Sequence, residues 1–258
     1  MDRIAVISDV HGNVPALEAV LADIRARGID LIFNLGDLVG KGARSDLTID
    51  RCQEVCQVVL RGNWDDAFVH DEGEGDSALL WYREQIGQER LAYLDTLPNV
   101  HDFWLSGRRV RLYHASQEGV YKRVHPWRPP EVLQAMFDNT EFTGFDHPSP
   151  DIVGCGDIHA AYMLPMRDIN KTAFNAGSVG NPLDMPLATY AILSGHYGSQ
   201  TPGSHTIDFV RLSYNIDAEL AEGARVGLPE LNYYEIELRT AEYRGAIKRR
   251  EREGQAQS

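Results

Sequence analysis

The chain has 258 residues, of which 43% are hydrophobic and 24% charged, enough to bury one large core or two small ones. We expect one domain over residues 1–258, with a core from about 3 to 212 and a helical tail from about 215 to 258. The net charge of −13 argues against nucleic acid as the main partner, because binding a phosphate backbone needs clustered Lys and Arg. No apolar run approaches the length of a membrane span and no signal-peptide pattern is seen, so we expect a cytoplasmic protein without a membrane partner.

The chain opens with alternating strands and helices. Residues 4–8 form a nearly unbroken apolar run, as expected of a strand buried on both faces, and residues 14–27 have apolar side chains at helical intervals. A second buried strand is predicted over 31–35, a helix over 45–57 and a third strand over 58–61. This order predicts a parallel sheet with right-handed crossovers, which brings the carboxyl ends of three strands to one edge.

Two longer segments are expected to cover part of that edge. Residues 66–90 are acidic and glycine-containing at first and then helical. Residues 115–150 contain several prolines, Trp127 and a group of basic residues, with a helix predicted over 130–137. Loops of this length inside a compact domain are more often functional than idle, and their shape decides specificity.

The other strands are predicted from short apolar runs. A hairpin is expected over 99–105 and 108–113, across the turn at Ser106 and Gly107, and a short strand over 152–155. Four later segments are predicted to be sequential strands of a second sheet: 163–167, 172–174, 188–193 and 206–212.

Polar residues with metal-binding side chains follow several of these strands. Each residue alone is weak evidence for a metal site, because an Asp or His after a strand usually caps a turn or forms a hydrogen bond within a loop. Together they supply oxygen and nitrogen donors for two metal ions, with one carboxylate to bridge them. Two ions about 3.5–4 Å apart are the usual means of phosphoester hydrolysis. The candidate ligands are Asp9, His11, Asp37, Asn63, His114, Asp157 and His159.

The order of these residues resembles the calcineurin-like metallophosphoesterase family, in particular its small bacterial branch of phosphodiesterase-like and diadenosine-tetraphosphatase-related proteins. The resemblance spans residues 3–212 and is carried by SDVHGN, GDLVGKG, RGNWD, YHAS, GDIH and NAGSVGNP. It implies a four-layer α/β/β/α sandwich of two mixed sheets packed face to face, with helices outside.

The resemblance also implies the roles of the site residues. Asp9, His11 and His159 would hold one metal ion, Asn63 and His114 the other, and Asp37 would bridge the two. It gives Asp37, Asn63 and His114 the catalytic roles. The ions expected first are manganese or iron, with zinc, nickel and cobalt as alternatives.

Two residues depart from the family pattern. Trp64 stands where many relatives have a catalytic His, and indole cannot protonate a leaving group at neutral pH. Solvent or the metal ions would then serve the leaving group, with His70 and His125 as weaker candidates. Asp157 replaces a ligand imidazole: it either ligates and hardens the second metal site towards manganese or iron(II), or faces away and leaves that site weaker.

Three further polar residues stay open between two roles. Arg61 would clamp phosphate or pair with the acidic segment after it. Lys41, in a glycine-rich loop after Asp37, is either a functional charge or a solvated one, and we favour the solvated role. Ser178 would bind phosphate or shape a turn.

We therefore expect an enzyme that hydrolyses a phosphodiester, a phosphomonoester or a nucleotide anhydride through hydroxide activated at a dinuclear metal site. The alternative is a catalytically weak regulatory module of the same fold that binds metal and nucleotide. Either would act on a small phosphorylated or nucleotide ligand, and a homo-oligomer stays open.

Overall fold

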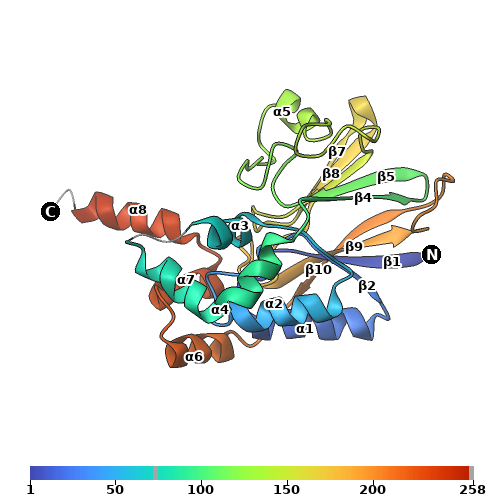
Figure 1. Cartoon of the computed structure of the whole chain (residues 1–258). Coiled ribbons are helices and arrows are strands. Elements are labelled where there is room, and N and C mark those ends of the chain that lie inside the picture. Colours follow the sequence, from blue (N-terminus) through green and yellow to red (C-terminus); the bar gives the residue numbers. More distant parts are fainter. Residues whose placement is uncertain (72–74, 256–258) are drawn as a thin grey trace.

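Two five-stranded sheets form the centre of the molecule (Figure 1). The computed structural model describes residues 1–71 and 75–255. The first sheet has the order β10-β9-β1-β2-β3, with β1 (Asp2–Ile7), β2 (Leu31–Asn34), β3 (Val58–Val59), β9 (Ala188–Gly195) and β10 (Thr206–Leu212). The second has the order β4-β5-β6-β8-β7, with β4 (Val100–Leu105), β5 (Arg108–Tyr113), β6 (Ile152–Cys155), β7 (Tyr162–Met166) and β8 (Lys171–Asn175). Each sheet mixes parallel and antiparallel pairs.

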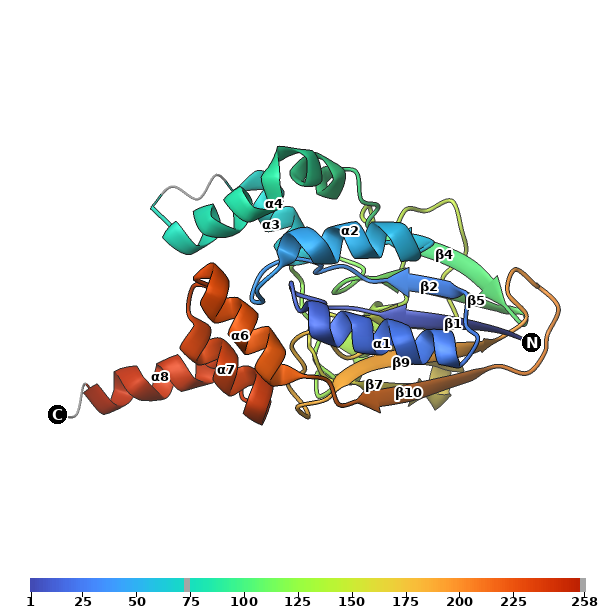
Figure 2. The same ribbon diagram turned by 90° about the horizontal axis from the view of Figure 1, so that it is seen from below.

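Helices cover the outer faces of the sheets. Figure 2 shows α1 (Val14–Ala26) and α2 (Ser45–Val55) lying along the first sheet, and Figure 1 shows α5 (Pro130–Ala135) on the far side of the second. The predicted four-layer α/β/β/α sandwich is confirmed. The remaining helices are α3 (Asn63–His70), α4 (Ser77–Asp95), α6 (Ile216–Val226), α7 (Leu231–Thr240) and α8 (Arg244–Gln255). Within the described ranges, none of the helices is long and apolar enough to span a membrane.

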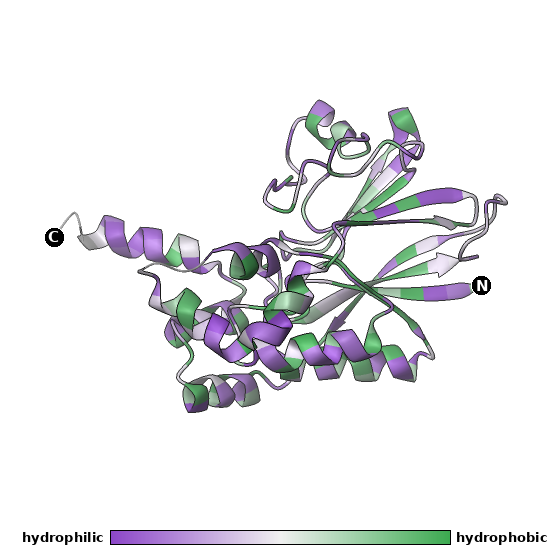
Figure 3. Ribbon diagram, viewed as in Figure 1, coloured by the Kyte–Doolittle hydropathy of each residue, from purple (hydrophilic) through white to green (hydrophobic). Residues whose placement is uncertain are grey.

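Strand β1 shows how the sequence builds these layers. Its side chains alternate between the two faces of the sheet. Ile4 and Val6 pack between the two sheets, whereas Ala5 and Ile7 pack in the cluster that contains the apolar face of α1. Hydrophobic segments therefore run along the inner strands and α1, while α8 is mainly hydrophilic (Figure 3). A strand buried on both faces is what the uninterrupted apolar run predicts.

The prediction for the last two strands was wrong in one respect. Strands β7 and β8 belong to the second sheet, as expected, but β9 and β10 complete the first. Strand β9 runs antiparallel to β1, with Val6 opposite Ala191. The free edge of β1, opposite β2, needs a hydrogen-bonding partner, and β9 supplies it. Chain order alone could not show which sheet had the open edge.

The third predicted strand is also shorter than expected. Strand β3 covers only Val58–Val59, and α3 begins at Asn63, directly after the turn at Gly62. The hairpin is confirmed: β4 pairs antiparallel with β5, and the turn residues Ser106 and Gly107 both have positive φ, 50° and 79°. The helical tail is seen as α6, α7 and α8.

Candidate metal centre

Two loops at the carboxyl ends of β1 and β2 bring the first ligands together. The strands are parallel neighbours, and their pairing continues into the loops: the Asp9 N–H donates to the Gly36 carbonyl at 3.0 Å and the His11 N–H to the Asp37 carbonyl at 2.9 Å. Asp9 and Asp37 are therefore held side by side, as the sequence predicted. Open α/β sheets place their ligand sites at this end of the strands.

The backbone at the candidate ligands is strained. Ten non-glycine residues of the described chain have positive φ, and five of them are candidate ligands. Such backbone conformations are sparsely populated, and they gather at functional sites where the surrounding structure holds them. The five are Asp9, His11, Asp37, Asp157 and His159, with φ between 47° and 63°.

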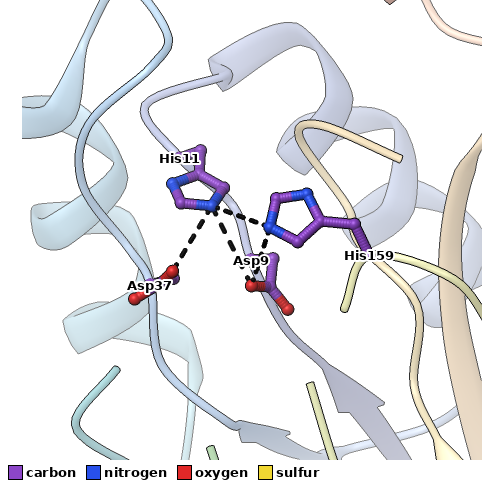
Figure 4. Close-up of side chains that lie close together, drawn as sticks. All are labelled: Asp9, His11, Asp37 and His159. Atoms are coloured by element: carbon purple, nitrogen blue, oxygen red, sulfur yellow. Dashed lines mark hydrogen bonds and ion pairs between the residues drawn. The ribbon is translucent and has the colours of Figure 1, made fainter. Parts of the chain in front are cut away.

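Four of these side chains converge on one point (Figure 4). One ligand atom from each of Asp9, His11, Asp37 and His159 lies within 4.8 Å of all the others, and all four residues are buried. The Nε2 atom of His11 lies 3.4 Å from Asp37 Oδ2, and that of His159 lies 3.2 Å from Asp9 Oδ1. We call these four residues the first cluster.

The imidazole rings are oriented as metal ligands. His11 Nδ1 lies 2.8 Å from the Val39 carbonyl oxygen and His159 Nδ1 lies 2.5 Å from that of Asn181. A carbonyl only accepts, so each Nδ1 carries the proton and each neutral ring has its lone pair on Nε2. The two Nε2 atoms are 3.1 Å apart, and facing lone pairs at that distance require a cation or a proton between them. The first cluster therefore fits a divalent metal ion.

The charges of the first cluster support the same conclusion. Asp9 Oδ1 is buried without a hydrogen-bond partner. Burial raises the pKa of Asp37 well above its ordinary value, and the Asp9 charge adds to the effect against the opposing attraction of His114. A buried carboxylate next to another stays ionised when a cation compensates it.

The turn that holds Asp37 depends on a neighbouring helix. Asp65, in the first turn of α3, accepts hydrogen bonds from the backbone N–H groups of Asp37 at 2.8 Å and Leu38 at 2.9 Å. A Cβ atom on Gly62 would lie 2.1 Å from Asp37 Oδ1, so only glycine fits there. Asp65 was not among the predicted site residues, although an acidic residue in the first turn of a helix is a recognisable capping signal.

A second group of candidate ligands lies beside Asp37. His114 Nε2 lies 3.0 Å from Asn63 Oδ1 and 3.5 Å from Asp37 Oδ1, and His114 Nδ1 donates to the Leu35 carbonyl at 2.9 Å. Burial lowers the pKa of His114, but the nearby carboxylates, Asp37 foremost, outweigh it and raise the value to about 9. We call Asn63, His114 and Asp157 the second cluster.

Asp157 has a protein partner of its own. Its carboxylate accepts from Arg123 Nε at 2.7 Å and from Arg123 Nη2 at 2.6 Å, and Oδ1 lies 3.9 Å from His114 Nε2. A bidentate guanidinium pair is the strongest partner that a carboxylate finds in a protein. Arg123 is one of the basic residues of the 115–150 segment, and no local pattern in the sequence pairs it with Asp157.

Trp64 lies against the first cluster. Its ring meets that of His11 edge-on, with centroids 5.6 Å apart, and a Cβ atom on Gly40 would lie 2.3 Å from the indole. Trp64 thus fills the wall above His11 without supplying an acid. Of the weaker candidates for that role, His70 is exposed beside Asp66, whereas His125 lines a cavity together with Asp37 and His159.

The structure also shows the contacts of Arg61, Lys41 and Ser178, whose roles the sequence left undecided. Arg61 pairs with Asp66 at 3.2 Å, and Ser178 Oγ donates to the Asp9 carbonyl at 2.8 Å and accepts from the Asn181 N–H, so it shapes the turn. The solvated role expected for Lys41 was wrong. Its side chain is buried, Nζ donates to Asn181 Oδ1 at 2.8 Å, and burial lowers its pKa to about 8.

Comparison with known proteins identifies the family. The profile of the calcineurin-like phosphoesterase superfamily domain matches residues 2–196. The chain belongs to the calcineurin-like phosphoesterase superfamily. This is a family of metal-dependent phosphoester hydrolases, although some members are not catalytic.

Individual relatives agree with this assignment. An uncharacterised protein of Methanocaldococcus jannaschii is 30% identical over 238 residues, which cover 88% of this chain and 94% of that protein. The crystal structure of a metallophosphoesterase from Sphaerobacter thermophilus matches with a TM-score of 0.73 and 25% identity, over 92% of this chain and 98% of that one. A hypothetical protein from Pyrococcus horikoshii has the same fold, with a TM-score of 0.73 at 18% identity over 94% of this chain and all of that one.

Proposed function

We propose that this calcineurin-like phosphoesterase hydrolyses a small phosphorylated substrate, a phosphodiester, phosphomonoester or nucleotide anhydride, with divalent metal ions held by the seven candidate ligands. The proposal is supported above all by the first cluster. Its ligand atoms converge, both imidazoles direct Nε2 inward, and the buried Asp9 Oδ1 accepts no hydrogen bond. Such a group of buried charged side chains is expected where a cation is bound.

The ions are proposed to divide between the two clusters. Asp9, His11 and His159 would hold one, Asn63 and His114 the other, and Asp37 would contact both, since Oδ2 faces His11 and Oδ1 faces His114. Manganese or iron suits this mixture of carboxylate, amide and imidazole donors. When bound, the ions would lower the pKa of water and neutralise charge that develops on the phosphoryl group.

The chain's own residues would position the substrate. Lys41 and Arg123 are cations that line the same cavity as Asp37 and His159. An Arg that lines the cavity offers several donors to phosphate oxygens, and a Lys a single point charge. The Nδ1–H groups of His11, His114 and His159 would donate to backbone carbonyls throughout the reaction, which fixes the orientation of the rings.

The test is hydrolysis of bis-p-nitrophenyl phosphate by protein stripped with chelator and then given manganese. Wild-type protein is expected to turn over only with metal, and Asp37→Asn to lower kcat by about a thousandfold or more while keeping the fold. Circular dichroism checks the fold, and Asp30→Asn on the surface is the control. Full activity in Asp37→Asn contradicts the mechanism.

One observation favours a second candidate function. Arg123 is paired with the Asp157 carboxylate, so the second cluster is expected to bind metal more weakly than the first, and Trp64 supplies no acid. A regulatory module that binds nucleotide and one metal ion without turnover would fit this arrangement. Tight nucleotide binding by calorimetry, with no hydrolysis of any phosphoester under any divalent metal, would support it over the enzyme.

A further inference from the structure

A cavity of about 480 Å³ opens onto the metal centre. Asp37, Asp157 and His159 line it, and so do side chains from two distant parts of the chain: the 115–150 segment and the junction between α7 and α8. Its size is within the range of pockets that hold small ligands. A substrate bound to the metal centre would occupy this cavity.

An exposed aromatic side chain stands in the lining. Trp127 is 75% exposed, the highest value among the large apolar side chains of the described residues. Its indole is nonetheless held in place, because the His125 ring is stacked on it, with centroids 4.4 Å apart and an interplanar angle of 11°. We call Trp127 and His125 the aromatic shelf. The indole face that His125 does not cover can stack on a flat ring.

Cationic side chains accompany the aromatic shelf. Lys41, Arg123 and Arg244 line the same cavity in a chain whose formal net charge is −13. The lining thus holds three cations and two carboxylates, those of Asp37 and Asp157, which suits a ligand with negative charge. Arg244 also pairs with Glu237 at 2.7 Å. A flat aromatic group together with phosphate is the chemistry of a nucleotide.

We propose that the cavity binds a nucleotide, with the base stacked on Trp127 and the phosphate directed to the metal centre and Arg123. The proposal narrows the substrate class of the proposed function and rests on it for the reaction, but binding of the nucleotide can be measured without turnover. Any base can stack on an indole ring, so the aromatic shelf would favour a nucleotide over a ligand without a base, but it would not determine which base is bound.

The proposal is tested by calorimetry with adenosine 5′-monophosphate and with ribose 5-phosphate, which lacks the base, on manganese-loaded protein. Trp127→Ala is expected to raise the Kd for adenosine monophosphate by about tenfold or more, since stacking of one base contributes about 1–3 kcal/mol, and to leave ribose 5-phosphate unchanged. Trp127→Phe keeps a ring and should bind close to wild type. Phe145→Ala is the matched control, because Phe145 is an aromatic residue of the same segment, 67% exposed, that lies outside the cavity lining.

The outcomes separate this proposal from the proposed function. Equal Kd values for wild type and Trp127→Ala, or an equal loss of both ligands, would overturn the aromatic shelf even if bis-p-nitrophenyl phosphate is hydrolysed. Base-dependent binding that needs Trp127 would establish it even if no ester is hydrolysed, in which case only the catalytic proposal fails.

Discussion

The two clusters of the metal centre share Asp37 as a neighbour but differ in how their side chains are satisfied. In the first, Asp9 Oδ1 accepts no hydrogen bond, although His159 Nε2 lies 3.2 Å away, and the His11 and His159 lone pairs face each other. In the second, Asn63 bonds His114 and Arg123 pairs with Asp157. Ligand atoms without a hydrogen bond in the protein are stabilised most when a cation binds. Ligand atoms that already have a protein partner must first give up that interaction. The first cluster is therefore preorganised for metal, and the second is not.

Loss of a ligand from the first cluster should have the largest effect. His11→Ala removes an inward-facing Nε2 and is expected to weaken binding of the tighter metal ion by about a hundredfold or more, since even indirect supporting residues contribute 10–100-fold. Asn63→Ala should reduce only the affinity of the weaker metal site. Metal titration by calorimetry with elemental analysis measures both. Equal losses in the two variants would show that the clusters do not differ.

Removal of Arg123 should have an intermediate effect of opposite sign. Arg123→Ala releases the Asp157 carboxylate next to His114, so the weaker site is expected to bind manganese about tenfold more tightly. Lys122→Ala is the control, because Lys122 pairs with Glu118 on the surface. The same titration gives the answer, and a weaker second site in Arg123→Ala would mean that Asp157 does not ligate.

The smallest expected effect is on the stability of the metal-free protein. Metal titration of the two clusters requires that this form stay folded at the pH used. Burial raises the pKa of Glu219 to about 7, against the hydrogen bond from the Ala43 N–H. An acid whose pKa is raised by folding stabilises the fold below its unfolded pKa, and that contribution is lost as pH rises through the folded value. The free energy of unfolding should therefore fall between about pH 5 and 8, by about 2 kcal/mol from this group.

Glu219→Gln should flatten that slope in urea unfolding of the metal-free protein. Glu222→Gln is the matched control, because ion pairs with Arg225 and Arg44 lower the pKa of Glu222 to about 2, so it titrates below this range. An unchanged slope in Glu219→Gln would show that another group carries the pH dependence.

The sequence predicted that the four residues of the first cluster lie close together, because they follow buried strands. Asp9 and Asp37 each end an apolar run, and adjacent parallel strands must bring them together. The partner of Asp157 could not be predicted, since Arg123 lies 34 residues away in a segment without periodicity. Burial of Lys41 depends likewise on Asn181, 140 residues further along the chain. Local pattern predicts which polar residues follow a strand, but not which distant side chains they contact.

The 3.1 Å distance between His11 Nε2 and His159 Nε2 also bears on how the two sheets are held together. His11 follows β1 of one sheet and His159 follows β6 of the other, 148 residues apart. A cation bound by both rings would cross-link the two sheets at this end of the molecule. Because a ligand that binds only the folded state stabilises it by mass action, chelation should lower the free energy of unfolding of the protein.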